Sequence, residues 1–167
     1  ILITTCLTIG RFFFILKFIK VKIYSKQTEI LSDTITPISV FLNLRDVYKS
    51  VSLFESSDYQ FKENSKSFIC VNPLVTVKVN NGELILIQND KQLSKSVFKS
   101  VDDLQNVFDS YAFDNTKLQR YNGFFGYVSF DSVQYFDSIK LQEKSKYKDV
   151  SEIYFSIFEF IIVFDNF

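Results

Sequence analysis

The chain has 167 residues, and its 19 Lys and Arg residues balance 19 Asp and Glu residues, so the formal net charge is zero. It contains 20 Phe and 9 Tyr residues but no His, Met or Trp. Because His is missing, a His-based catalytic triad and an imidazole metal ligand are excluded. Two Cys residues cannot form a four-thiolate metal site. The balanced charge argues against a nucleic-acid-binding domain, which normally has an excess of basic residues.

The first 23 residues are strongly apolar, but Arg11 and Lys17 interrupt the run. A membrane-spanning helix needs about 20 mostly apolar residues, and an Arg near its centre costs about 2.5–3.5 kcal/mol. A signal peptide would carry its charges before the apolar core and a small-residue cleavage site after it. We therefore expect no membrane association and a cytoplasmic protein, in which Cys70 is a buried reduced thiol.

A helix followed by short strands is predicted for residues 36–88. Thr36 can cap the helix through its hydroxyl, and Pro37 suits the first helical position. One apolar helix face would consist of Val40, Phe41, Leu44 and Val47. Strands are predicted at Ser52–Glu55, Ser67–Val71, Val75–Val79 and Leu84–Gln88. The Asn-Asn-Gly sequence at 80–82 favours a hairpin turn between the last two strands.

A second helix is predicted from apolar residues that recur every three or four positions. These residues are Val97, Val101, Leu104, Phe108 and Tyr111. Ser100 and Asp103 resemble a capping box near its start. A polar loop is expected after this helix, at residues 115–121.

The C-terminal part predicts an aromatic strand at 123–130 and a short helix that Asp131 caps and that ends at Phe136. Residues 140–152 would be a solvated connection, and Ile153–Phe164, which is apolar on both faces, a central strand. Together the elements predict an α+β fold with mostly antiparallel β-sheets, sandwich-like, and a few flanking helices.

Two glycines in the aromatic strand invite comparison with a phosphate-binding loop. Neither Lys-Ser nor Lys-Thr follows them, and no third glycine is present. We expect Gly123 and Gly126 to permit close strand packing instead.

Three segments stand in a recognisable order. They are ITPISVFLNLRD (35–46), SLFESSD (52–58) followed by KSFICVNP (66–73), and NGFFGYVSFDSVQYFD (122–137) followed by the terminal FEFIIVFDNF. In this order and spacing they resemble the N-terminal region of the anthranilate synthase component I family. Members of that family typically show a T-P-x-S start, an L-L-E-S element, a G-G-x-x-G-Y segment and a closing V-V-F-D-H.

The resemblance implies a domain organisation and an activity. Residues 22–167 would form the family's N-terminal domain, residues 1–21 would be an extraneous or disordered apolar leader, and the catalytic chorismate-binding domain with its Mg²⁺ would be absent from this chain. The complete enzymes convert chorismate and ammonia into anthranilate and pyruvate, and a glutamine amidotransferase subunit supplies the ammonia. We therefore expect no catalytic, cofactor-binding or metal-binding residue here, and no activity from this chain alone.

The resemblance also implies that this region carries part of a feedback site for tryptophan. The matching positions are Glu55, Ser56, Lys66 and Pro37. Glu55 could bind the ammonium of the amino acid, and Ser56 and Lys66 could donate hydrogen bonds to its carboxylate. Pro37 and nearby aromatic residues would help to form an apolar slot for the indole, which the catalytic domain completes.

Three alternatives remain open. The N-terminal region of aminodeoxychorismate synthase component I, in the folate branch, shares the pattern, and the sequence of a catalytic domain would distinguish the two. A free-standing, non-catalytic amino-acid-binding fragment would bind tryptophan unaided. A membrane-anchored protein rests only on the apolar residues 1–23.

Overall fold

The computed structural model describes residues 2–8, 20–31, 34–55, 65–113, 121–139 and 150–165. The strands are β1 (Leu2–Thr8), β2 (Val21–Glu29), β3 (Val51–Glu55), β4 (Lys66–Asn80), β5 (Glu83–Gln88), β6 (Lys91–Val97), β7 (Tyr111–Phe113), β8 (Phe125–Val128) and β9 (Ile153–Asp165). The helices are α1 (Pro37–Arg45), α2 (Val101–Asp109) and a 3₁₀ helix (Phe130–Tyr135). Within the described residues one sheet has the order β6-β5-β4-β9-β1-β2-β7, with β3 beside β4 and β8 beside β9. Antiparallel pairing predominates, which confirms the predicted α+β class; β2 and β7 pair in parallel.

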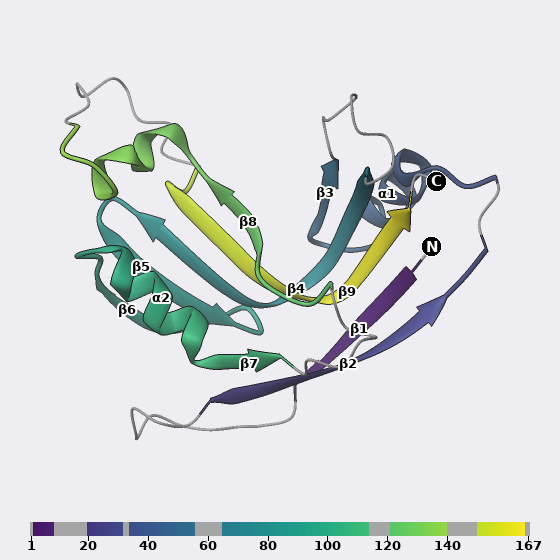
Figure 1. The fold of residues 1–167 in the computed structure, drawn as a ribbon, viewed down its shortest axis with the longest axis horizontal. Coiled ribbons are helices and arrows are strands. Elements are labelled where there is room, and N and C mark those ends of the chain that lie inside the picture. The colour runs from purple at the N-terminus through teal and green to yellow at the C-terminus, as the bar shows by residue number, and fades with distance from the viewer. Residues whose placement is uncertain are drawn as a thin grey trace.

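Strands β4 and β9 pair along almost their whole length and form the spine of the sheet. Their register shifts between Pro73 and Val75, next to Asn72, whose φ is 58°. Before this irregularity β4 also pairs with β3, and after it with β5. Both long strands curve strongly, so the two halves of the sheet turn toward each other (Figure 1). The sandwich-like arrangement is therefore built from one bent sheet.

Two tight turns set the register of β4, β5 and β6. Asn81 and Gly82 both have positive φ, and they connect Asn80 to its ladder partner Glu83. A two-residue hairpin loop of this kind requires positive φ at both positions, which Asn and Gly adopt easily. Asn89 and Asp90 repeat the arrangement between β5 and β6. The first turn confirms the predicted hairpin, whereas β6 was not predicted.

Both long helices begin where their capping residues predict. Thr36 and Ser39 form a reciprocal capping box at the start of α1, with Pro37 at the first position. Ser100 and Asp103 do the same for α2. The predicted second helix was too long, because Val97 ends β6 before the cap and Tyr111 already pairs with Val21 in the sheet.

Two predictions near β8 need correction. Asp131 does not cap the short helix: it lies in the first turn, and Ser129 occupies the cap position. Gly126 does permit close packing, because a Cβ built there would lie 1.8 Å from the carbonyl oxygen of Tyr154 on β9. Gly123 has no such role, since a Cβ at that position would meet nothing within 4 Å.

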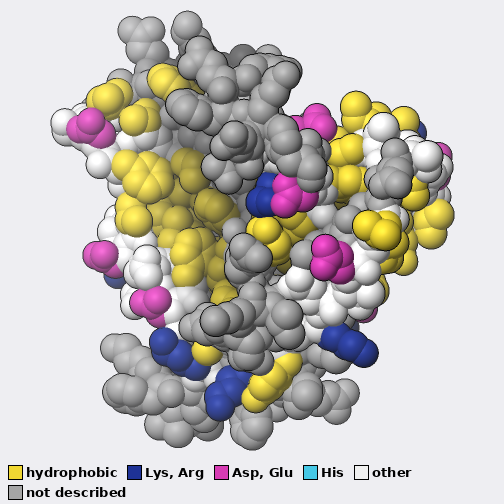
Figure 2. Space-filling model, turned by 45° about the vertical axis from the view of Figure 1, so that its right-hand side comes forward, with side chains coloured by type: hydrophobic (Ala, Val, Ile, Leu, Met, Phe, Trp, Pro, Cys, Tyr) yellow, Lys and Arg dark blue, Asp and Glu magenta, His cyan; other side chains and the backbone are white. Residues whose placement is uncertain are grey.

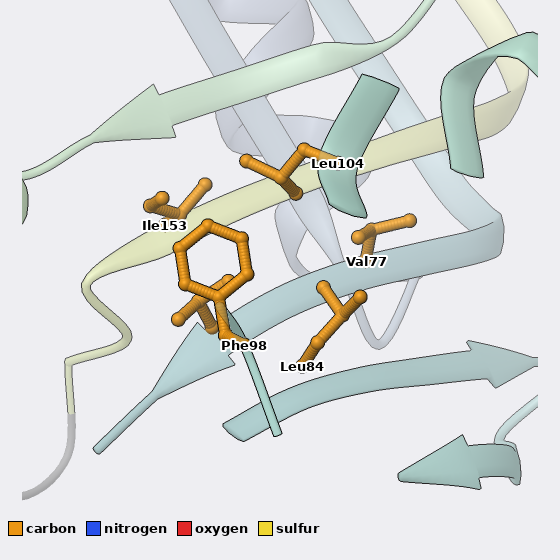
Figure 3. Packing of buried hydrophobic residues seen from close by; sticks show 6 residues of the cluster. Val77, Leu84, Phe98, Leu104 and Ile153 are labelled. Carbon is orange, nitrogen blue, oxygen red and sulfur yellow. The ribbon is translucent and has the colours of Figure 1, made fainter. Parts of the chain in front are cut away.

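Apolar side chains fill the space between each helix and the sheet. Helix α1 packs through Val40, Phe41 and Leu44 against a buried group made of Ile69, Val71 and Phe164. Helix α2 contributes Leu104 to a second group, in which Val77, Val79, Leu84, Phe98 and Ile153 are also buried (Figure 3). Each half of the sheet thus has its own helix on one face.

Residues Leu2–Thr8, which fall in the predicted leader, form β1 between β9 and β2 in the structure. Whether residues 1–21 lie outside the natural domain stays a prediction. No helix in the part of the chain that the structure describes is long and apolar enough to cross a membrane.

Candidate functional site

One end of the sheet brings together the start of β4 and the end of β9. The ladder places Lys66, the first residue of β4, directly opposite Asp165, the last residue of β9. Residues opposite each other in an antiparallel ladder project to the same face of the sheet. The Nζ of Lys66 donates a hydrogen bond of 2.6 Å to Oδ2 of Asp165. This charge pair is the centre of the candidate site.

The surroundings of Lys66 favour its charged form. Its side chain is 25% exposed, against 61% for Asp165. The hydrogen bond from Lys66 to Asp165 raises the pKa of the lysine above its ordinary value, and this effect outweighs the opposing effect of partial burial. Lys66 therefore stays a cation at physiological pH and can hold a carboxylate.

Aromatic side chains adjoin the charge pair. The Nζ of Lys66 lies 5.9 Å from the ring centroid of Tyr121, within the range of a cation–π contact. Phe68, next on the same face of β4, has its ring 5.9 Å from that of Tyr121 and 5.6 Å from that of Phe125. Phe125 in turn lies 6.0 Å from Phe54 of β3. These four half-buried rings, Phe54, Phe68, Tyr121 and Phe125, are called the aromatic cluster below.

Buried apolar residues support the aromatic cluster from below. They are Cys70, Phe158, Ile161 and Val163. Cys70 is fully buried, as predicted. Figure 2 shows that hydrophobic side chains gather in separate areas of one face of the molecule, with charged side chains beside them. A charged pair at the border of an apolar surface suits a ligand that combines both characters.

The structure separates two of the predicted effector residues. Glu55, the last residue of β3, lies opposite Ser67, so its side chain shares the face of Ser67. Successive residues of a strand project to opposite faces, and Lys66 therefore projects to the other side of the sheet. Glu55 is exposed, whereas Ser67 is 3% exposed. Glu55 and Lys66 do not converge on one point.

Of the two other predicted residues, Pro37 lies apart from the charge pair, and Ser56 is not among the described residues. Pro37 is half-buried at the start of α1, and α1 packs on the face of Ile69 and Val71. That is the face that Glu55 shares, not the face of Lys66. Ser56 lies outside the described residues.

Sequence reasoning missed Asp165 and Tyr121. Asp165 belongs to the closing segment that carries the family resemblance, but its pairing with Lys66 depends on the register of two strands with an irregularity between them. Tyr121 was assigned to a polar loop. The sequence around Asp165 and Tyr121 contains no motif that identifies either residue as a ligand contact.

A second polar cluster joins the 3₁₀ helix to Glu152, the residue that precedes β9. The hydroxyl of Tyr135 donates a 2.7 Å hydrogen bond to Oε2 of Glu152, which is 7% exposed, and Ser132 donates one of 2.5 Å to the carbonyl oxygen of Glu152. Burial, and then the hydrogen bond to Glu152, raise the pKa of Tyr135 to about 12. The rings of Phe98 and Tyr135 meet edge to face, with 5.0 Å between their centroids. We interpret this cluster as structural, since every group in it serves to fix the helix.

The described residues show no cluster of metal-ligating side chains. No three Asp, Glu, His or Cys side chains gather within the described ranges in a way that could hold a metal ion.

No family model matches the chain. The chain is 30% identical over 142 residues to anthranilate synthase component 1 of Lactococcus lactis subsp. lactis (strain IL1403). The aligned part covers 84% of this chain but 30% of that protein, so the chain spans less than a third of the relative's length. The identity shows a distant relationship to that family.

Proposed function

We propose that this chain, a distant relative of anthranilate synthase component 1, is the N-terminal, non-catalytic region of an enzyme of that type. The parent would convert chorismate and ammonia into anthranilate and pyruvate in tryptophan biosynthesis. The observation that carries the proposal is the identity over 142 residues, which spans most of this chain. The order of the T-P, F-E-S and G-Y-V-S-F-D segments in the chain supports the same interpretation.

The chemistry of the parent would lie outside this chain. The Lys66–Asp165 pair and the Tyr135–Glu152 cluster are accounted for by contacts within the sheet and with the 3₁₀ helix, so neither is proposed as a catalytic group. A catalytic region with Mg²⁺, and a glutamine amidotransferase subunit that delivers ammonia, would complete the enzyme. This chain alone would then be inactive.

The role of this region would be support and feedback inhibition by tryptophan. The effector positions that the resemblance proposes are Lys66, Glu55, Ser56 and Pro37, although Glu55 and the helix of Pro37 lie on the face of the sheet opposite to Lys66. Lys66 is supported by its geometry, because it is a partly exposed cation next to aromatic rings. Inhibition would follow if tryptophan bound more tightly to an inactive arrangement of the parent than to the active one.

The test is the reaction of the longest natural polypeptide that contains this chain. Supplied with chorismate, Mg²⁺ and an ammonium salt, it should form fluorescent anthranilate, and tryptophan should inhibit it. Formation of aminodeoxychorismate without anthranilate would assign the protein to the folate branch instead. A polypeptide that consumes no chorismate would contradict the proposal.

A further inference from the structure

The chain contains two Asn-Gly sequences, and the structure places them in different surroundings. Asn81 and Gly82 form the two-residue turn between β4 and β5, with φ of 51° and 72°. Asn81 is exposed, and within the described part of the chain its side chain forms no hydrogen bond. Asn122, which precedes Gly123, is half-buried, and its Nδ2 donates a hydrogen bond to Oγ of Ser25.

An asparagine that precedes glycine can lose its side-chain amide without an enzyme. The main-chain nitrogen of the glycine attacks Cγ of the asparagine, so an N–Cγ bond forms and the Cγ–Nδ2 bond breaks. Ammonia leaves with the proton of the attacking N–H, and a cyclic imide remains. Water then opens the imide at one of its two carbonyl carbons, which gives either aspartate or isoaspartate. Glycine favours the first step because it has no Cβ beside the attacking nitrogen.

We propose that Asn81 is a site of spontaneous deamidation in the folded chain, and that its surroundings protect Asn122. Ring closure requires the main chain of Asn81 to rotate, and the turn permits this when only the last ladder pair of the hairpin opens. A Cβ built at Gly82 would meet nothing within 4 Å, so there is room beside this residue. The hydrogen bond to Ser25 holds the Asn122 amide that would have to turn toward its glycine. The proposal is independent of the proposed function.

The neighbouring turn provides an internal control. Asn89 and Asp90 join β5 to β6 with nearly the same backbone, at φ of 47° and 61°, and Asn89 is exposed like Asn81. The two turns differ in the residue that follows the asparagine. The side chain of Asp90 crowds the attacking nitrogen, and its negative charge opposes the loss of the proton. Asn89 should therefore react slowly, although its turn has the same form.

The substitution Asp90→Gly should transfer the reactivity to Asn89. Glycine adopts the positive φ of this position without strain. The ion pair of Asp90 with Lys49 has a length of 3.8 Å, and both side chains are mostly exposed, so its loss should leave the fold intact. Circular dichroism checks the fold of the variant.

The isoaspartate product would change the contacts of the first turn. It adds a methylene group to the main chain, so the connection from Asn80 to Glu83 would no longer match the two strands. The carbonyl oxygen of Gly82 accepts a 2.8 Å hydrogen bond from the N–H of Phe98, which is 5% exposed in the core beside α2. Isoaspartate would displace this contact, whereas aspartate adopts positive φ as asparagine does and would keep the turn.

The experiment follows the folded chain at neutral and mildly alkaline pH by mass spectrometry of tryptic peptides. The peptide of residues 79–91 contains both Asn81 and Asn89, and the peptide of residues 121–140 contains Asn122. Digestion in water labelled with heavy oxygen identifies deamidation that occurs during handling. Asn81 should convert roughly tenfold faster than Asn89 and Asn122, or more. In folded Asp90→Gly, Asn89 should convert at about the rate of Asn81.

Unfolding separates the effect of the structure from that of the sequence. In guanidinium chloride, Asn81 and Asn122 should convert at similar rates, since glycine follows both. The isolated isoaspartate form should unfold at a lower urea concentration than the variant Asn81→Asp. Equal rates at Asn81 and Asn122 in the folded chain would overturn the proposal. So would conversion of Asn81 no faster than that of Asn89, or an Asn89 that stays slow in folded Asp90→Gly.

Discussion

Lys66 lies directly opposite Asp165 across the β4–β9 ladder, although the two residues are 99 positions apart in the sequence. Their ion pair joins the first residue of one long strand to the last residue of the other. The pair thus closes one end of the bent sheet and also exposes a cation beside aromatic rings. A single contact can therefore contribute to stability and to ligand binding, and the two contributions can be measured separately.

The contribution of the ion pair to stability should depend on pH. Because Asp165 raises the pKa of Lys66 above its ordinary 10.5, the stabilisation is fully present below about pH 10.5 and is lost as the pH rises through the folded-state pKa. Asp165→Asn should lower the free energy of unfolding by roughly 0.2–1 kcal/mol at pH 7, the range for exposed pairs. Urea unfolding at pH 7 and at about pH 11.5 measures this, and the difference between variant and wild type should shrink at the higher pH. An equal difference at both values would contradict the role of the lysine charge.

A methyl group at Gly126 should separate β8 from β9. A Cβ there would lie 1.8 Å from the carbonyl oxygen of Tyr154 and 2.7 Å from the Cα of Phe155, and both are backbone atoms that cannot move independently. Gly126→Ala should therefore lower the free energy of unfolding by about 1–3 kcal/mol. Gly123→Ala is the control, since open space surrounds that position and it should be neutral or slightly stabilising. Equal effects of the two substitutions in urea unfolding would contradict the close approach.

Removal of the Tyr135 hydroxyl should weaken the anchor of the 3₁₀ helix. Tyr135→Phe takes a donor from the carboxylate of Glu152, which is 7% exposed, so a loss of about 1–3 kcal/mol in the free energy of unfolding is expected. Tyr127→Phe, at a more exposed tyrosine, should cost much less.

The same tyrosine gives a prediction for alkaline pH. Its pKa is raised from 10.0 to about 12 in the folded chain, so the stabilisation is present below about pH 10 and is lost as the pH rises toward 12. Burial also raises the pKa of Tyr111, so the absorbance of tyrosinate during an alkaline titration should show more than one late-titrating tyrosine in the wild type and one fewer in Tyr135→Phe. Equal numbers of late-titrating tyrosines in the two proteins would contradict the partly buried contact with Glu152.

The family resemblance predicts an effect of Ser56 that needs no knowledge of its local structure. Ser56→Leu in the natural polypeptide should relieve inhibition by tryptophan, because a bulky apolar side chain would replace a donor for the effector carboxylate. Turnover without tryptophan should stay nearly unchanged. Inhibition curves for anthranilate formation measure both, and unchanged inhibition would remove Ser56 from the effector site.

Local chemistry predicted the starts of elements better than their ends. The capping boxes at Thr36 and Ser100 correctly mark the first turns of both helices. The apolar residues Val97 and Tyr111 continue the spacing of the second helix, but an apolar residue at either position can equally belong to a strand that precedes or follows the helix. Pairing with distant residues decided the outcome, since Val97 pairs with Glu83 and Tyr111 with Val21.

In the candidate site, too, the sequence predicted one part and only the structure showed the other. The resemblance identifies Lys66, but only the three-dimensional pairing shows that Asp165 is its partner and that Glu55 projects to the other face. In a ladder with a register shift near Pro73, one residue of difference would exchange the faces. The sequence alone could not determine which carboxylate accompanies the lysine.

The most direct measurement of the central claim is tryptophan inhibition of anthranilate formation by the natural polypeptide with and without the Lys66 charge. Lys66→Gln should raise the inhibition constant for tryptophan at least tenfold, which corresponds to about 1.4 kcal/mol, while kcat and KM for chorismate stay within about twofold of the wild type. Inhibition by tryptophan that is equally strong in the variant would contradict the claim that this region binds the effector through Lys66.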